Sequence, residues 1–160
     1  MRKVSLLFLA VCFTGAFFFP GCDAEGGINP LGETIILPDN LVGKWVSTYG
    51  EEFEIKRPTF GVGEFIASYS GTVGYSGPIL NVRSDGFGGG YITILYTVSN
   101  WTSGAVGRYY VIHWQRLTGT SVEFAGSKDG AGRPTQLEAE WEYQVINGYF
   151  DMHSSCTKTP

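Results

Sequence analysis

The chain is 160 residues long; 43% of its residues are hydrophobic and 16% are charged. This length suits one domain with a short extension. The formal net charge is −4, and the only adjacent basic pairs are Arg2-Lys3 and Lys56-Arg57. Because nucleic-acid binding needs a stripe of lysine and arginine, the composition argues against that class of function.

The first 21 residues have the three-part pattern of an export signal. Arg2 and Lys3 give a positive start, Val4 to Phe19 is almost wholly apolar, and Pro20-Gly21 then interrupts the run. This order predicts a signal peptide over residues 1–21. The apolar run is shorter than the about 20 residues of a bilayer span, and no other apolar run of comparable length follows it, so we do not expect the mature chain to cross a membrane.

Cys22 follows Gly21 directly, and Phe19 stands three positions before it. This end of the signal resembles the lipobox of bacterial lipoproteins. The resemblance implies that the chain is cut before Cys22, which then carries lipid. It also implies a membrane partner reached through that lipid, in the cell envelope and at the outer membrane, on its periplasmic face or the cell surface. Cleavage near the same point without lipidation is the alternative.

The three cysteines support this interpretation. Cys12 leaves with the signal, Cys22 takes the lipid, and Cys156 remains alone. An exported domain without an internal disulfide must be held together by its core. A Cys22–Cys156 disulfide is the alternative if lipidation fails.

Residues 22–40 are expected to form the lipidated N-terminus and a flexible tether. Gly26-Gly27, Pro30, Gly32 and Pro38 break regular structure in this stretch, which is also polar. The apolar run Ile35-Ile36-Leu37 could instead lie along the domain as an edge strand.

From Leu41 to Cys156 the chain consists of short segments in which apolar and polar residues alternate, separated by glycine-rich turns. This pattern predicts a mainly β domain over residues 41–156: a single antiparallel up-and-down β-barrel of about eight strands. The expected strands are residues 42–46, 53–55, 65–75, 80–82, 92–98, 110–114, 122–124 and 148–154. Asn147-Gly148 is a turn signal before the last of them.

Residues 133–145 fit two kinds of structure. Apolar and polar residues alternate along the stretch, as in a strand. Yet Thr135 and Glu138 have the spacing of a helix capping box, and Leu137, Trp141 and Val145 fall on one helical face. We favour a short helix near residues 135–143, laid against the barrel.

The stretch Leu41-Val42-Gly43-Lys44-Trp45 opens the predicted barrel. Gly-x-Trp on a first strand after an export signal resembles the lipocalin and calycin barrels, and the wider texture resembles small lipocalin-like bacterial lipoproteins. The resemblance implies that Trp45 closes the barrel floor and that Gly43 lets the chain bend close to it. The arginine that packs on this tryptophan in lipocalins has no clear counterpart; Arg116 is the nearest candidate by type.

Patterns typical of catalysis or metal binding are sparse. A triad could be assembled from Ser84, Asp85 and His113, but no nucleophile elbow marks the serine. His113 and His153 are the only histidines and fit ordinary strand positions, so we expect no catalytic residue, metal or cofactor. The glycine-rich stretch 85–90 lacks the end of a phosphate-binding loop and is better interpreted as a hairpin.

The aromatic residues suggest two functions. A small barrel of eight strands either fills with side chains or holds one small ligand. The first hypothesis is a non-enzymatic barrel that binds a small hydrophobic or amphipathic ligand. Its candidate pocket residues are Tyr69, Tyr96, Tyr110, Trp114 and Phe124. The alternative is a structural or interaction lipoprotein with a filled core, whose loop residues Phe87 and Trp101 contact an unknown protein partner.

Overall fold

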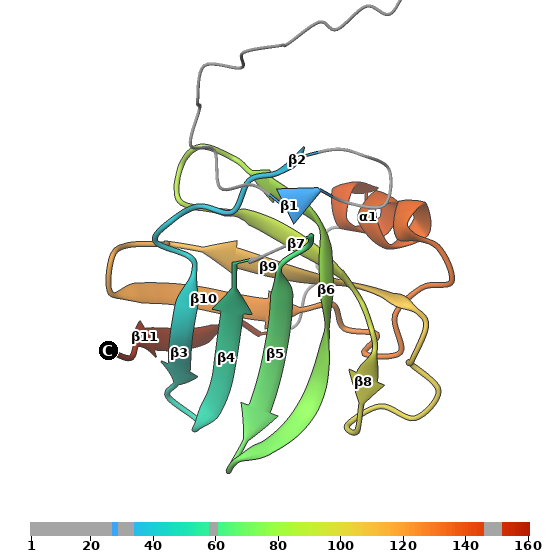
Figure 1. The fold of residues 1–160 in the computed structure, drawn as a ribbon, viewed down its shortest axis with the longest axis horizontal. Coiled ribbons are helices and arrows are strands. Elements are labelled where there is room, and N and C mark those ends of the chain that lie inside the picture. The colour runs from blue at the N-terminus through green and yellow to red at the C-terminus, as the bar shows by residue number, and fades with distance from the viewer. Residues whose placement is uncertain (1–26, 29–33, 58–60, 146–151) are drawn as a thin grey trace, which may run out of the picture.

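The computed structural model describes residues 27–28, 34–57, 61–145 and 152–160. These residues form a closed antiparallel barrel with one helix, as the sequence predicts (Figure 1). The barrel strands are β3 (Gly43–Ser47), β4 (Glu51–Lys56), β5 (Glu64–Tyr69), β6 (Thr72–Ser84), β7 (Gly90–Leu95), β9 (Tyr109–Gln115), β10 (Ser121–Gly126) and β11 (Ser154–Lys158). Outside this ring lie β1 (Gly27–Ile28), β2 (Thr34–Ile35), β8 (Val98–Ser99) and helix α1 (Gln136–Val145).

The barrel is of the up-and-down kind. Each barrel strand pairs antiparallel with the next along the chain, and β11 pairs with β3 to close the ring. The short strand β8 adds to β6, and β1 pairs with β2 near the N-terminal end of the described chain. The ring leaves no barrel strand with an open edge among the described residues, which removes the usual site of aggregation.

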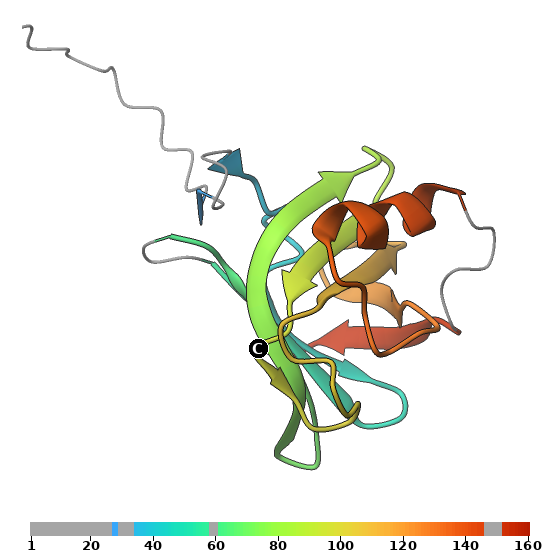
Figure 2. The same cartoon turned by 90° about the vertical axis from the view of Figure 1, so that its right-hand side faces the viewer.

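Side-chain alternation explains why these segments form strands. In β4, Phe53 and Ile55 are buried inside the barrel while Glu52 and Lys56 face solvent. Strand β7 differs because both of its faces are buried, including Tyr91 and Thr93 on the outside. Helix α1 covers that outer face, where Ala139 packs with Tyr91 and Val111 (Figure 2).

The predicted boundaries of the strands at 65–75 and 80–82 are wrong. The predicted strand 65–75 is a hairpin, because Ser70 and Gly71 both have positive φ and turn the chain between β5 and β6. The predicted start at Leu80 is also wrong, since β6 runs through Gly77-Pro78 without a break. Its part up to Pro78 pairs with β5, and its part from Ile79 pairs with β7. The glycine and proline therefore mark a change of partner.

The predicted helix and its capping box are confirmed. The backbone N–H of Glu138 donates to Thr135 Oγ1, and the backbone N–H of Thr135 donates to Glu138 Oε2, both at 3.2 Å. The predicted contact face is wrong: Leu137 and Trp141 are exposed, whereas Ala139 is fully buried against the barrel.

A glutamate on the same helix fixes its position on the barrel. Glu140 Oε1 accepts hydrogen bonds from Asn81 Nδ2 and Thr93 Oγ1, each at 2.9 Å. These two donors come from β6 and β7, so one carboxylate oxygen ties the helix to both strands. Gln136 of the helix donates to the same oxygen at 2.8 Å.

One end of the barrel is filled. Leu41 and Trp45 are fully buried there, and Trp45 Nε1 donates to the Leu41 carbonyl at 2.9 Å. Ile35 and Leu37 are also buried in the core, while Ile36 between them is exposed. Residues 35–37 thus lie along the domain, which is the alternative that the sequence left open.

A lysine covers the tryptophan in place of the expected arginine. Lys158 Nζ lies 5.0 Å from the Trp45 ring centroid and donates to the Asn40 carbonyl at 3.0 Å. Arg116 instead pairs with Glu123, so it is not the counterpart of the lipocalin arginine. Gly43 has φ +125°, and a Cβ there would lie 2.9 Å from Lys158 Cε, so the glycine makes room for the lysine.

The last strand is displaced from its predicted position, 148–154, to Ser154–Lys158. The Asn147-Gly148 turn signal lies outside the described residues. So does the segment for which the sequence predicts a signal peptide and a lipidated cysteine. Within the described chain, no helix has the length and apolar character that a membrane span requires.

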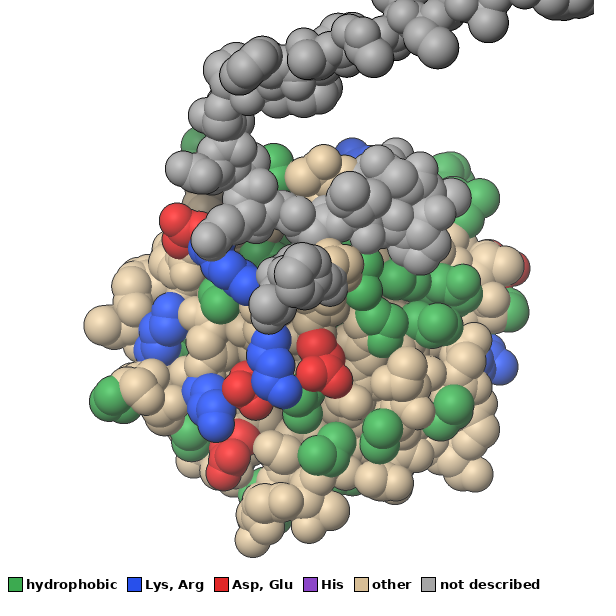
Figure 3. Space-filling model, in the orientation of Figure 1, with side chains coloured by type: hydrophobic (Ala, Val, Ile, Leu, Met, Phe, Trp, Pro, Cys, Tyr) green, Lys and Arg blue, Asp and Glu red, His purple; other side chains and the backbone are tan. Residues whose placement is uncertain are grey.

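Charged side chains of both signs gather on the face formed by β3 to β5 (Figure 3). Lys56 lies 3.2 Å from Glu64 and 3.8 Å from Glu54. Because these groups are exposed, each pair contributes at most about 1 kcal/mol. They do, however, balance the negative charge on this face locally.

Candidate functional site

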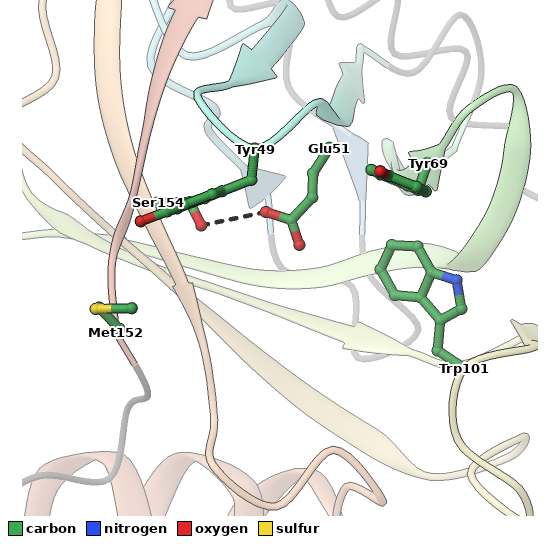
Figure 4. A pocket seen from close by; sticks show the side chains of 6 residues that line it. All are labelled: Tyr49, Glu51, Tyr69, Trp101, Met152 and Ser154. Atoms are coloured by element: carbon green, nitrogen blue, oxygen red, sulfur yellow. Dashed lines mark hydrogen bonds between the residues drawn. The ribbon is translucent and has the colours of Figure 1, made fainter.

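The barrel end opposite Trp45 is hollow. A cavity of about 550 Å³ opens there, lined by Tyr49, Glu51, Tyr69, Trp101, Met152 and Ser154 (Figure 4). These residues come from the β3–β4 turn, the ends of β4 and β5, the loop after β8 and the chain entering β11. Separate parts of the fold therefore build the mouth of the barrel.

A second cavity lies next to the mouth, inside the barrel. Its volume is about 230 Å³, and it adjoins the first because both are lined by Glu51, Trp101, Met152 and Ser154. Its deeper wall consists of core side chains, among them Phe53, Tyr75, Tyr110, Ile112 and Phe124. The space narrows from a wide mouth to an aromatic interior, and its size is in the range typical of small-molecule sites.

Trp101 is held in place at the rim. The backbone N–H groups of Asn100 and Trp101 both donate to the Gly74 carbonyl, at 2.6 and 3.3 Å. The indole lies against Gly74, where a Cβ would be only 1.9 Å from the ring. Its ring also meets Tyr75 edge-on, with centroids 5.6 Å apart. The residue is half exposed, with one side on the barrel and the other open to the cavity.

Three tyrosines form the inner aromatic wall. Tyr75 meets Tyr96 and Tyr110 edge-on, with centroids 5.6 Å apart in each pair, and Tyr96 stacks on Tyr110 at 5.0 Å. The Tyr96 hydroxyl donates to the Gly130 carbonyl and the Tyr110 hydroxyl to the Ser127 carbonyl. Burial raises the pKa of Tyr75 and of Tyr96 well above the ordinary value, so these phenols stay neutral.

Glu51 brings a charge into this aromatic mouth. Its Oε2 atom accepts hydrogen bonds from Ser47 Oγ at 3.3 Å and Ser154 Oγ at 3.2 Å. No lysine or arginine is among the described residues that line either cavity. The carboxylate is thus positioned by two hydroxyl groups and has no basic neighbour in the described cavity wall.

The structure places the predicted pocket residues at different depths. Tyr69 lies at the mouth, and Tyr110 and Phe124 line the inner cavity. Tyr96 is buried behind Tyr110, and Trp114 is buried in the core away from both cavities. The loop residues separate: Trp101 is at the mouth, whereas Phe87, 95% exposed, lies in the β6–β7 loop at the filled end.

Sequence reasoning missed Glu51, Tyr49, Met152 and Ser154. For Glu51 a signal existed: residues 51, 53 and 55 share one face of a strand, and Phe53 and Ile55 are plainly core residues. Two adjacent glutamates suggest a solvated face, which holds only for Glu52. Tyr49, Met152 and Ser154 lie in turns or at strand ends, where the alternation of apolar and polar residues does not predict which way a side chain points.

The remaining reactive groups lie outside the cavity. His113 Nδ1 and His153 Nε2 are 2.8 Å apart on the outer surface of the barrel. Cys156 is buried with a free thiol, and burial raises its pKa to about 12, which makes it a poor nucleophile. Among the described residues, no group of three or more histidine, cysteine, aspartate or glutamate side chains could hold a metal ion.

Comparisons with known proteins assign neither a ligand nor an activity to this site. The barrel is compatible with a calycin-like fold, which is a statement about architecture alone. No protein-family model matches this chain, and neither a curated protein nor a solved structure matches it.

Proposed function

We propose that this protein is a non-enzymatic, lipid-anchored carrier or receptor of the cell envelope, whose barrel binds a small hydrophobic or amphipathic molecule. One observation supports binding above all: the 550 Å³ mouth adjoins a second cavity whose wall includes the aromatic residues of the barrel interior. A polar or charged group at the mouth and an apolar portion inside would match the wall at both depths.

The half-exposed ring of Trp101 provides a test of the binding site. A neutral apolar fluorophore, N-phenyl-1-naphthylamine, is titrated into the full chain and its emission is followed. Trp101→Ala should weaken binding about tenfold, since a large aromatic wall is lost. Trp141→Ala, which removes an exposed tryptophan from the outer helix, is the matched control. Absence of saturable binding, or equal loss in both variants, would count against the cavity.

The lipid anchor rests on the sequence around Cys22 and needs its own test. Cells expressing the full chain are fed an alkyne-labelled fatty acid, and the purified protein is examined for label. The wild type should carry label and fractionate with membranes, whereas Cys22→Ser should lose the label and leave the membrane fraction. Several acyl chains are enough for firm anchoring, at about 0.8 kcal/mol per buried methylene. A labelled Cys22→Ser variant would refute the assignment.

A second function is favoured by one separate observation. Phe87 is 95% exposed at the tip of the β6–β7 loop, where Asp85 Oδ1 accepts hydrogen bonds from the backbone of Phe87 and Gly89. An exposed aromatic residue on a shaped loop suits contact with a protein. If the barrel binds no small molecule, crosslinking through a photoreactive residue at position 87 tests this interaction role directly.

A further inference from the structure

Glu51 is the acidic residue that lines both cavities at the mouth of the barrel. Six other acids of the described chain form ion pairs with lysine or arginine: Asp39, Glu54, Glu64, Glu123, Asp129 and Glu142. No ion pair of Glu51 occurs within the described residues. Its two described side-chain hydrogen-bond donors, Ser47 and Ser154, are neutral and both reach the same oxygen, Oε2.

The field of this carboxylate extends into the barrel. Burial is the main cause of the raised pKa of the Tyr75 phenol and of the Cys156 thiol, and the charge of Glu51 adds to it in both. The second oxygen, Oε1, accepts no hydrogen bond within the described chain, and the Glu51 side chain lines both cavities. A negative charge therefore faces a space whose other described lining residues carry no charged side chain.

The rings around Glu51 favour the same sign of ligand charge. Figure 4 shows the carboxylate between Tyr49 on one side and Tyr69 and Trp101 on the other. The face of an aromatic ring carries negative potential and attracts a cation within about 6 Å of its centre. The thioether of Met152, on the same rim, is soft and polarizable and suits contact with an alkylated ammonium group.

We propose that the ligand of this cavity is an organic cation: a primary amine or quaternary ammonium group that carries an apolar portion. The proposal rests on the proposed binding function and narrows it to one ligand class. The cationic group lies at Glu51 among the rim rings, and the apolar portion enters the inner cavity against Tyr75, Tyr110 and Phe124. Carboxylates and sulfates are repelled by Glu51, so ordinary fatty acids are poor ligands.

A matched ligand series tests the head group alone. The probes are 4-phenylbutylamine, its trimethylammonium analogue, 4-phenylbutanol and 4-phenylbutyrate, titrated calorimetrically into the full chain at neutral pH. Both cations should bind at least about tenfold more tightly than the alcohol, and the carboxylate should bind most weakly. The trimethylammonium probe has no N–H donor, so its binding separates ring attraction from hydrogen bonding.

Two neighbouring glutamates supply the protein control. Glu51→Gln should lower the affinity for both cations about tenfold and change that for the alcohol less than about twofold. Glu52→Gln removes the same charge from the outward-facing neighbour and should leave the affinities for all four probes unchanged. If Glu51→Gln fails to fold, Trp101→Leu serves instead: it keeps apolar volume and removes the ring, and it should weaken binding of the cations severalfold more than binding of the alcohol.

The outcomes separate the two levels of the proposal. Equal affinity for cation and alcohol, or a cation preference that survives Glu51→Gln, overturns the organic-cation assignment and leaves the binding barrel standing. Failure of all four probes together with the neutral naphthylamine fluorophore overturns the binding function itself.

Discussion

His113 Nδ1 and His153 Nε2 lie 2.8 Å apart, although 40 positions separate the two residues in the chain. One ring must donate its N–H while the other accepts, so at least one imidazole is neutral. The surrounding groups are Asp85 and Tyr143 beside His113, and Glu123 and Arg116 beside His153. The contact links β9 to the segment that carries Met152 and Ser154, both of which line the cavity.

This contact predicts a loss of stability in mild acid. Burial and the nearby His153 lower the pKa of His113 to about 4, although Asp85 opposes the shift. Burial also lowers the pKa of His153. Because the unfolded chain takes up protons near pH 6.5, the folded state is fully stabilised above that pH and loses stability as the pH falls towards 4.

Urea unfolding at pH 7.5 and pH 4.5 measures this effect. The free energy of unfolding of the wild type should fall by on the order of 2 kcal/mol more than that of His113→Asn, after allowance for the partial exposure of the pair. The carboxylates titrate alike in both proteins and cancel in the comparison. An identical pH dependence in the two proteins would show that the pair does not control acid stability.

Lys158 closes the barrel over Trp45, and replacing it should lower the free energy of unfolding by a measurable amount. Lys158→Ala loses the cation–ring contact and the bond to the Asn40 carbonyl, which together contribute about 1 kcal/mol. Lys158→Arg should retain most of this stabilisation, since a guanidinium can make both contacts. Lys128→Ala changes an exposed lysine elsewhere and is the control. Chemical denaturation measures the free energy of unfolding of each variant. Equal values for the wild type and the three variants would show that Lys158 does not stabilise the closed end of the barrel.

Gly74 sets the position of Trp101 at the mouth. In Gly74→Ala, the new methyl carbon would lie only 1.9 Å from the nearest atom of the indole, so the ring must leave the rim. Affinity for the neutral naphthylamine probe should fall about as far as in Trp101→Ala, that is roughly tenfold. Gly119→Ala places a methyl group in open space at a turn and should bind normally. Unchanged affinity in Gly74→Ala would mean that the ring is not part of the binding surface.

Glu140 tests how the helix is held on the barrel. Glu140→Ala leaves the buried Thr93 hydroxyl and the Asn81 amide without their acceptor, which should cost about 1–3 kcal/mol. Glu140→Gln keeps one acceptor oxygen and should cost less. Leu137→Ala, at an exposed position of the same helix, should change stability by no more than about 0.5 kcal/mol. A result in which Leu137→Ala is the more damaging change would reverse the assigned helix face.

Local signals in the sequence are enough to predict the architecture. Alternation over two residues, glycine-rich turns and the Thr135–Glu138 capping box act within a few positions, and they predict the barrel and its helix. The same rule turns Glu51 inward with Phe53, because parity along a strand holds for charged residues as well as apolar ones.

Contacts between distant residues cannot be predicted in this way. Lys158 reaches Trp45 only because β11 pairs with β3, and His153 reaches His113 only because the chain returns along the barrel. The face of the helix that packs on the barrel also depends on distant residues. Leu137 and Trp141 form the more apolar stripe of the helix, yet the side chains of Tyr91 and Val111 already fill the outer surface of the sheet. A small residue, Ala139, therefore lets the helix approach.

Pairing of β11 with β3 also decides when the protein can fold. These strands are the last and the first of the barrel, so closure requires residues that are synthesised after all the other barrel strands. A nascent chain that lacks Ser154–Lys158 has two unpaired edges, on β3 and β10, facing the same gap. Such a chain is a template for strand exchange with a second copy, and the five C-terminal strand residues act as the protection against it.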